Sequence, residues 1–281
     1  MVNSIGRLGY MKNYVLLVDV DKCNQCYNCV LACKDEHFGN DFPPITAGCK
    51  ELGQNWLDLE IVERGSNDQV FVACQPVGCR HCAEPPCVTE SGAAYKREDG
   101  IVILDPSKAN SMDKIGACPY SAIVWNDEKN LAQKCTMCAH LLDAGEKEPR
   151  CVEACPTSCL TFGDLNDPDS KVSKLIEGNN ELNSQSGIVR YFNKTGRVIA
   201  GCVYLNEKEV AERAEVSLIH AGDIVERAFA NGFGDFRFIN LDDAADYSLE
   251  IKYPGIPNLV HRDCKADKDF WYEEIYLENS E

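Results

Sequence analysis

Cysteine spacing constrains this chain more than any other feature of its sequence. The chain of 281 residues contains 17 cysteines and only 5 histidines. An odd number of cysteines cannot all pair in disulfides within one chain, and a chain of this length can bury a core without such crosslinks. The cysteines therefore predict metal binding, and their spacing indicates which metal.

The first run of cysteines has the spacing of a bacterial ferredoxin. It has the form Cys-x2-Cys-x2-Cys-x3-Cys, and its members are Cys23, Cys26, Cys29 and Cys33. In such a run three thiolates hold one 4Fe–4S cluster, and the fourth ligates a neighbouring cluster. We therefore expect this run to serve a pair of clusters.

Three further groups of cysteines complete the pattern. One is a Cys-x2-Cys-x4-Cys run, the next is a single cysteine followed by proline, and the last is Cys-x2-Cys followed by Cys-x3-Cys-Pro. If the first run pairs with the last, and the two inner groups pair with each other, twelve cysteines form three sets of four. The predicted ligands are Cys23, Cys26, Cys29 and Cys155 for cluster 1; Cys135, Cys138, Cys151 and Cys33 for cluster 2; and Cys79, Cys82, Cys87 and Cys118 for cluster 3.

A fourth cluster is expected to be absent. Its ligands would include Ser91, where the inner run lacks its last cysteine, and three cysteines upstream of Cys118, where residues 108–114 contain none. All four ligands of that one cluster are missing together, whereas the other three sets are complete. The sequence therefore predicts three 4Fe–4S clusters and one vacant site. The remaining cysteines are interpreted as small buried hydrophobic side chains, namely Cys49, Cys74, Cys159, Cys202 and Cys264.

Structural zinc is the alternative that paired Cys-x2-Cys motifs leave open. Zinc takes four ligands in separate pairs, whereas the first run places four thiols within eleven residues. His81 and His140, beside two of the runs, are interpreted as hydrogen-bond donors or packing residues, and Lys134 as a residue that tunes a cluster potential electrostatically. We expect no catalytic residue in this chain.

The order of the cysteine groups predicts an α+β chain built from two tandem bacterial-ferredoxin-like units. Residues 1–63 and 128–165 would form an outer unit with two clusters, and residues 64–127 an inserted unit with one cluster and the vacant site. The polar residues 166–197 are interpreted as a linker. Residues 198–281 alternate with period two over short segments, which predicts an all-β sandwich.

The sequence also predicts one strand pairing and the packing of one aromatic segment. The strand-like segments Gly100–Asp105 and Ala122–Asn126 are predicted to pair with each other. The aromatic segment from Phe270 to Tyr276 is predicted to pack on the sandwich or on a partner chain.

Charge and hydropathy exclude several classes of protein. A formal net charge of −17 disfavours nucleic acid and anionic membrane surfaces as partners. No run of about 18 apolar residues is present, so direct membrane insertion is not expected. Because the first ten residues lack the apolar core of a secretory signal, and because many thiols are expected to stay free, we expect a cytoplasmic location.

The cysteine order, together with Gly100-Ile101-Val102, Cys118-Pro119-Tyr120 and the segment from Lys134 to His140, resembles the iron–sulfur subunits of the dimethyl sulfoxide reductase superfamily. The resemblance covers roughly residues 14–165. It implies a non-catalytic electron-transfer subunit in a heterodimer. The large partner would be a catalytic subunit that holds a molybdenum bis-pterin guanine dinucleotide cofactor.

Within that superfamily, a vacant fourth site followed by a β-sandwich is similar to the small subunits of pyrogallol–phloroglucinol transhydroxylase and of catechol dehydroxylases. This implies a partner that acts on aromatic hydroxyl compounds. The C-terminal region resembles an immunoglobulin-like or carboxypeptidase-regulatory-type sandwich. Two alternatives stay open, namely an iron–sulfur subunit of an inorganic-substrate reductase (polysulfide, thiosulfate or nitrite) and a free-standing polyferredoxin.

Overall fold

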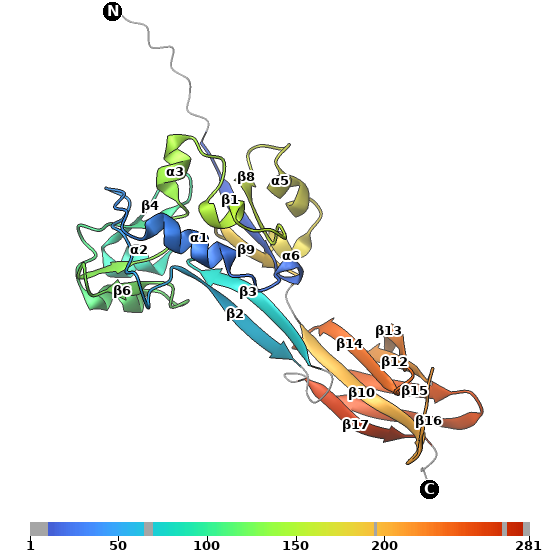
Figure 1. Cartoon of the computed structure of the whole chain (residues 1–281). Helices are drawn as coiled ribbons and strands as arrows, with labels where there is room; N and C mark the ends of the chain where they lie inside the picture. The colour runs from blue at the N-terminus through green and yellow to red at the C-terminus, as the bar shows by residue number, and fades with distance from the viewer. Residues whose placement is uncertain (1–10, 65–69, 194–195, 266–268, 278–281) are drawn as a thin grey trace, which may run out of the picture. The chain divides into compact units, whose positions relative to one another are not determined.

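The computed structural model describes residues 11–64, 70–193, 196–265 and 269–277 (Figure 1). The chain divides into two compact units. Unit 1 comprises Met1–Glu60 and Cys74–Asn193, and unit 2 comprises Ile61–Ala73 and Lys194–Glu281.

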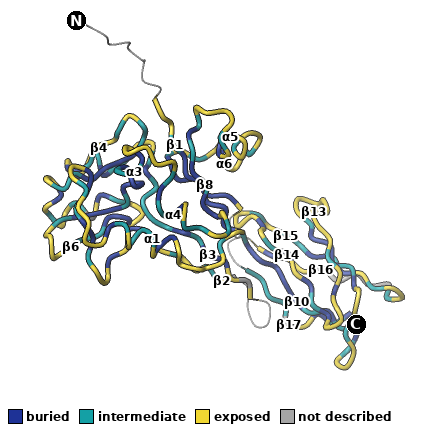
Figure 2. The backbone as a smooth tube through the Cα atoms, turned by 45° about the horizontal axis from the view of Figure 1, so that its top comes forward, coloured by how far each residue is buried: buried dark blue, intermediate teal, exposed yellow. Residues whose placement is uncertain are grey.

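Unit 1 contains a three-stranded sheet of order β8-β1-β9. Strand β1 (Tyr14–Asp19) pairs antiparallel with β8 (Leu160–Asp164) and parallel with β9 (Val189–Phe192). Five of the six residues of β1 are buried (Figure 2). Its apolar sequence fits a central strand that is covered on both faces.

Most of the predicted linker, residues 166–193 of 166–197, instead contributes three elements to unit 1. These residues contain α5 (Lys171–Ile176), α6 (Asn180–Asn183) and β9. Val172 and Leu182 of these helices are fully buried in one core with Val15 and Leu17 of β1. The polar residues that suggested a linker include helix caps, because Ser170 and Asn179 accept hydrogen bonds from backbone N–H groups in the first turns of α5 and α6.

The rest of unit 1 consists of short helices and hairpins between the cysteine groups (Figure 1). The helical elements are η1 (Val20–Lys22), α1 (Asn28–His37), α2 (Pro86–Ser91), η2 (Met112–Ala117), α3 (Ala139–Ala144) and α4 (Arg150–Glu153). The paired strands are β2 (Leu57–Arg64) with β3 (Phe71–Gly78), β4 (Ala94–Lys96) with β5 (Val102–Leu104), and β6 (Val124–Asn126) with β7 (Leu131–Gln133). The end of β2 and the start of β3 are grouped with unit 2, which includes Ile61–Ala73.

The predicted pairing of Gly100–Asp105 with Ala122–Asn126 is wrong. Strand β5 pairs with β4, and β6 pairs with β7. Each of these strands has a partner a few residues away along the chain, and a short hairpin loop costs less chain entropy than a longer closure.

Unit 2 contains two four-stranded sheets. One has the order β11-β10-β14 with β17 also paired to β10, and the other has the order β13-β12-β15-β16. Phe238 of β14, Leu218 of β12 and Leu249 of β15 are fully buried in one core to which both sheets contribute. The strands are β10 (Arg197–Asn206), β11 (Glu209–Val210), β12 (Glu215–His220), β13 (Asp223–Phe229), β14 (Asp235–Leu241), β15 (Tyr247–Tyr253), β16 (Ile256–Cys264) and β17 (Phe270–Tyr276).

The aromatic C-terminal segment is a strand of unit 2. It forms β17, which runs parallel to β10 and places Phe270 opposite Ile199. Gly201 of β10 lies opposite Tyr272, and a Cβ atom at this glycine would lie 2.8 Å from the Tyr272 carbonyl oxygen. Glycine at this position therefore permits the close approach of the two strands.

Candidate metal centre

Twelve thiols of unit 1 lie in three groups, which we call the first, second and third sets. Electrostatic interactions link Cys29 to the other members of the first set, Cys33 to those of the second, and Cys87 to those of the third. The first set is Cys23, Cys26, Cys29 and Cys155; the second is Cys33, Cys135, Cys138 and Cys151; the third is Cys79, Cys82, Cys87 and Cys118. The structure thus brings together the residues that the sequence analysis groups.

Two short helices each supply thiols to both the first and the second set. Cys29 and Cys33 are four residues apart on α1 and so lie on one helix face. Cys151 lies on α4, and Cys155 follows just after its end. Helices α1 and α4 pack against each other. Of the two cysteines on or next to each helix, one belongs to the first set and the other to the second. The first and second sets are therefore neighbours.

The loops that carry the Cys-x2-Cys motifs have an unusual backbone conformation. Gln25, Tyr27, His81, Met137 and Cys138 all have φ between 46° and 60°, in the left-handed region that residues other than glycine seldom adopt. In one of these loops the Met137 N–H donates to Cys135 Sγ at 3.3 Å. Such turns aim backbone N–H groups at sulfur, and strained backbone of this kind is concentrated at functional sites.

Burial disfavours free thiolates in the first and second sets. It raises the pKa of the Cys29 thiol to about 11 and that of Cys138 to about 12, and it raises the pKa of Cys33 as well. A metal that binds such a sulfur replaces its proton and compensates the thiolate charge. These pockets therefore favour a bound cation over free thiolates.

Cys79 of the third set behaves differently. Burial alone would raise its pKa, but His81 and Lys134 outweigh that effect and lower the pKa to about 5. Both residues are almost completely buried. Two basic side chains thus stabilise negative charge on this sulfur.

The side chain of Ser91 forms hydrogen bonds with the backbone of neighbouring residues. Its hydroxyl donates to the Cys87 carbonyl and accepts from the Ala93 N–H at 3.1 Å. Around this position the buried residues are apolar, and η2 packs on α2. The core there consists of Cys87, Ala93, Val102, Leu104, Ala109, Ala117, Ile123 and Ala132. The segment that carries Ser91 therefore lies beside an apolar core.

The second and third sets are also neighbours. One cavity in unit 1 is lined by Cys33, Cys135, Cys138 and Cys151 of the second set and by Cys79 of the third. The second set is therefore a neighbour of both others, because Cys151 of the second set also interacts with Cys29 of the first.

Tyr191 is a residue of this centre that sequence reasoning missed. It is buried on β9, lines the cavity of the second set, and donates from its hydroxyl to the Pro76 carbonyl at 2.8 Å. Arg80, which follows Cys79, lies over its ring. The apolar residues on either side of Arg190, from Ile188 to Phe192, are the signal for this strand in the sequence, whereas the polar residues before them favour a linker.

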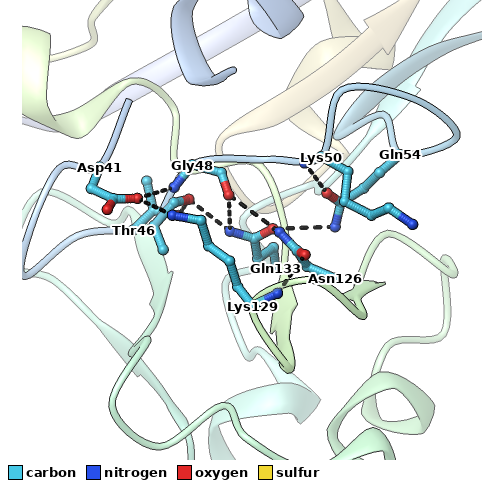
Figure 3. A network of polar contacts seen from close by, with 9 residues as sticks. Asp41, Thr46, Gly48, Lys50, Gln54, Asn126, Lys129 and Gln133 are labelled. Atoms are coloured by element: carbon cyan, nitrogen blue, oxygen red, sulfur yellow. Dashed lines mark hydrogen bonds and ion pairs between the residues drawn. The ribbon is translucent and has the colours of Figure 1, made fainter. Parts of the chain in front are cut away.

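The loop after α1 is attached to the β6–β7 hairpin by a polar network (Figure 3). The Gln133 amide donates to the carbonyls of Ala47 and Gly48 and accepts from Asn126 at 2.8 Å and from Gln54 at 3.2 Å. Because this loop carries Cys49, which lies beside Cys33, the network supports the wall of the second set.

The remaining five cysteines are not assigned to a set, although Cys159 interacts with Cys23, Cys29 and Cys155 of the first set. Cys49, Cys74, Cys159 and Cys264 are buried, as predicted, whereas Cys202 is only half-buried and its thiol donates to Asp235 at 2.7 Å. In the part of the chain that the structure describes, no group of three or more Cys, His, Asp or Glu side chains is arranged to hold a single metal ion. No helix among the described residues is long and apolar enough to cross a membrane.

Comparisons with known proteins identify the family. A family model described as a 4Fe-4S dicluster domain matches residues 70–165. The chain is 38% identical over 258 residues to the pyrogallol hydroxytransferase small subunit of Pelobacter acidigallici, and this alignment covers 87% of the chain and 92% of that protein. The chain belongs to the iron–sulfur subunits of the dimethyl sulfoxide reductase family.

Other members of this family are similar over a smaller share of the chain. A protein of Halobacterium salinarum assigned as a dimethyl sulfoxide reductase iron–sulfur subunit is 34% identical over 199 residues, covering 59% of this chain and 71% of that one. A tetrathionate reductase subunit of Salmonella typhimurium is 33% identical over 166 residues, covering 58% and 62%. As a member of this family, the chain is an electron-transfer subunit of the molybdopterin oxidoreductase type.

The residues of the centre fit 4Fe–4S clusters. A cubane cluster takes four thiolates and accepts hydrogen bonds at its sulfur atoms. Each of the three sets supplies four thiols, and the Nε2 atom of the buried His81, which interacts with Cys79 and Cys135, has no hydrogen-bond partner among the described residues. Bound clusters would provide sulfur acceptors at that position.

Proposed function

We propose that this chain carries three 4Fe–4S clusters and relays single electrons to or from a molybdenum bis-pterin catalytic subunit. The observation that carries the proposal is the arrangement of twelve thiols as three sets of four. The first set would hold cluster 1, the second cluster 2 and the third cluster 3. The clusters supply one-electron storage, and the protein sets their potentials.

The order of the sets suggests the route of the electrons. The second set is a neighbour of both others, so cluster 2 would be the middle station of a relay from cluster 1 to cluster 3. The first two sets draw on residues 23–33 and 135–155, and the third on residues 79–118. This supports an outer ferredoxin-like unit with two clusters and an inserted one with a single cluster.

The partner is proposed to act on aromatic hydroxyl compounds, by hydroxyl transfer or by dehydroxylation. Residues 1–197 make up about 70% of the 281-residue chain, whereas the Pelobacter small subunit aligns with 87% of it. That similarity therefore extends into the strand-rich C-terminal region. We propose that this region is an immunoglobulin-like or carboxypeptidase-regulatory-type sandwich, on the grounds that two sheets contribute to one core.

An inorganic-substrate reductase is the second candidate. It is supported by the similarity to the tetrathionate reductase subunit, although that similarity covers only 58% of the chain. This share is less than the 70% contributed by residues 1–197, so it does not require any similarity in the C-terminal region. A free-standing polyferredoxin would purify with its clusters but without a molybdenum-containing partner.

The first experiment is elemental analysis of the native protein purified without oxygen. Three clusters give about twelve irons and twelve sulfides per chain. We expect in addition one molybdenum from a large partner that co-purifies. About twelve irons without molybdenum would favour the polyferredoxin, and zinc in place of iron would exclude electron transfer by this chain.

The Cys118→Ser variant tests the proposed third set. Loss of one ligand should remove one cluster, so the iron content should fall by about four atoms per chain. Cys202→Ser is the matched control, because its thiol interacts with Asp235 in unit 2 and lies outside the three sets. An unchanged iron content in Cys118→Ser would contradict the proposed ligand assignment.

Electron counting separates the two proposed aromatic reactions. Reductive removal of one hydroxyl consumes two electrons and two protons and releases water, whereas hydroxyl transfer between two rings consumes no net electrons. If the complex removes hydroxyl groups, adding a catechol should reoxidise the reduced clusters in proportion to the amount of catechol added. If it transfers hydroxyls, product should form from a pyrogallol while the clusters stay reduced.

A further inference from the structure

His81 lies between the second and third sets and its ring is held in a defined orientation. The side chain is 1% exposed. Its Nδ1 atom accepts a hydrogen bond from the Val102 N–H at 3.0 Å. Since Nδ1 is an acceptor, the neutral ring carries its proton on Nε2.

The proton on Nε2 faces sulfur. Within the described residues Nε2 has no hydrogen-bond partner of normal length, and the side chains that interact with it are those of Cys79 and Cys135. Cys79 belongs to the third set and Cys135 to the second. The acceptors that this buried N–H faces are therefore sulfur atoms of both sets.

Lys134 places a positive charge beside the same two sets. It is 2% exposed, and its Nζ atom donates to the carbonyls of Val102 at 2.5 Å and of Cys135 at 3.1 Å. Among the described residues no ion pair is found for it. Val102 thus holds both side chains, because its N–H orients His81 and its carbonyl anchors Lys134.

We propose that His81 and Lys134 raise the reduction potentials of clusters 2 and 3 together, and that they act as one donor pair at the junction between these clusters. The inference rests on the proposed function, since it requires both clusters. Reduction adds one negative charge to a cluster. An N–H aimed at its sulfur and a buried ammonium group stabilise the reduced form more than the oxidised form.

This pair gives the relay a direction. Cluster 1 lies outside its reach, because its ligands do not include Cys79 or Cys135. Clusters 2 and 3 are therefore expected to be easier to reduce than they would be without the pair, which favours electrons on these two clusters relative to cluster 1. His81 and Lys134 act on the clusters through a hydrogen-bond donor and a positive charge, and they contact no substrate.

The test is an EPR-monitored redox titration of the anaerobically purified full chain, with its partner where the two co-purify. The variants are His81→Gln and Lys134→Met. In each, the reduction equilibria of two clusters should become at least tenfold less favourable, a shift of about 59 mV per cluster for a one-electron couple. The potential of cluster 1 should not shift.

Two controls separate this role from general packing. Lys134→Arg keeps the positive charge. Its cluster potentials should therefore match those of the wild-type protein and not those of Lys134→Met. His140→Gln changes a similarly placed histidine whose Nε2 pairs with Glu36 at 2.9 Å, and it should leave all three potentials unchanged. Wild-type potentials in His81→Gln and Lys134→Met at full iron content would overturn the inference.

A measurement on the wild-type protein tests the role of His81 even if the variants fail to assemble their clusters. With 15N-labelled histidine, pulsed EPR should detect one Nε2–H coupled to two different clusters. Absence of that coupling would overturn the role of His81 while leaving the proposed function intact. Absence of three cluster signals in the wild-type protein would instead contradict the proposed function itself.

Discussion

His37, at the end of α1, is packed among aromatic rings. Its ring centroid lies 4.4 Å from that of Trp56 and 5.4 Å from that of His140. Burial, and next the nearby His140, lower the pKa of His37 to about 3. The ring is therefore neutral at neutral pH and serves as a flat apolar side chain beside the second set.

This residue should contribute to the pH dependence of stability. Its folded-state pKa lies below the unfolded value of about 6.5, so the unfolded chain binds the proton more readily. Stability is thus expected to fall as the pH decreases below about 6.5. In His37→Phe the fall should be smaller, as measured by thermal unfolding at a fixed scan rate between about pH 7.5 and pH 5. Parallel pH profiles would contradict this prediction.

At the scale of elements, the β6–β7 hairpin and the loop after α1 depend on buried amide groups. Gln133 and Asn126 are 2% and 0% exposed, and they satisfy backbone carbonyls that the loop leaves unpaired. The ion pair between Lys129 and Asp41 joins the same segments at the surface, at 2.6 Å (Figure 3). The two contacts differ mainly in burial, so they can be compared directly.

Replacing the buried amide should cost more than removing the ion pair. Gln133→Leu leaves buried polar groups without partners, each worth about 1–3 kcal/mol of unfolding free energy. Lys129→Met removes a solvent-exposed pair and should cost less than about 1 kcal/mol. Denaturant unfolding of both variants under anaerobic conditions tests the order. A larger loss in Lys129→Met than in Gln133→Leu would show that the network does not support the loop.

At the scale of the whole molecule, the two units rely on different sources of stability. Unit 2 has one core of sixteen buried apolar residues drawn from both sheets. Unit 1 also has apolar cores, but its Cys-x2-Cys loops in addition bring thiols together. A bound cluster crosslinks four thiolates, so its binding free energy becomes folding free energy for those loops.

Removing iron should therefore affect unit 1 first. After chelation of iron under reducing conditions, amide hydrogen exchange should accelerate in residues 23–33 and 135–155. Exchange in β10, β12 and β15 of unit 2 should change little, because their core contains no metal ligand. Hydrogen exchange followed by mass spectrometry measures both units in one sample. Equal loss of protection in unit 1 and unit 2 would contradict this prediction.

The spacing of the cysteines by itself determined the family and the grouping of the candidate ligands. The two-residue gaps between Cys23, Cys26 and Cys29 suit three corners of one cluster, and the joint absence of four other ligands points to three clusters. Alternation after Val198 likewise predicted the strand-rich C-terminal region. These features are local, so they can be seen in the sequence without a structure.

Tertiary structure alone decided how distant segments meet. Residues 166–197 look like a linker because their few apolar residues gain burial only against β1, and strand β9 is held by pairing with a strand some 170 residues earlier in the chain. The position of His81 likewise depends on the Val102 N–H, 21 residues away. Spacing in a sequence indicates which side chains can share a metal, but orientation toward that metal depends on contacts that only the folded chain creates.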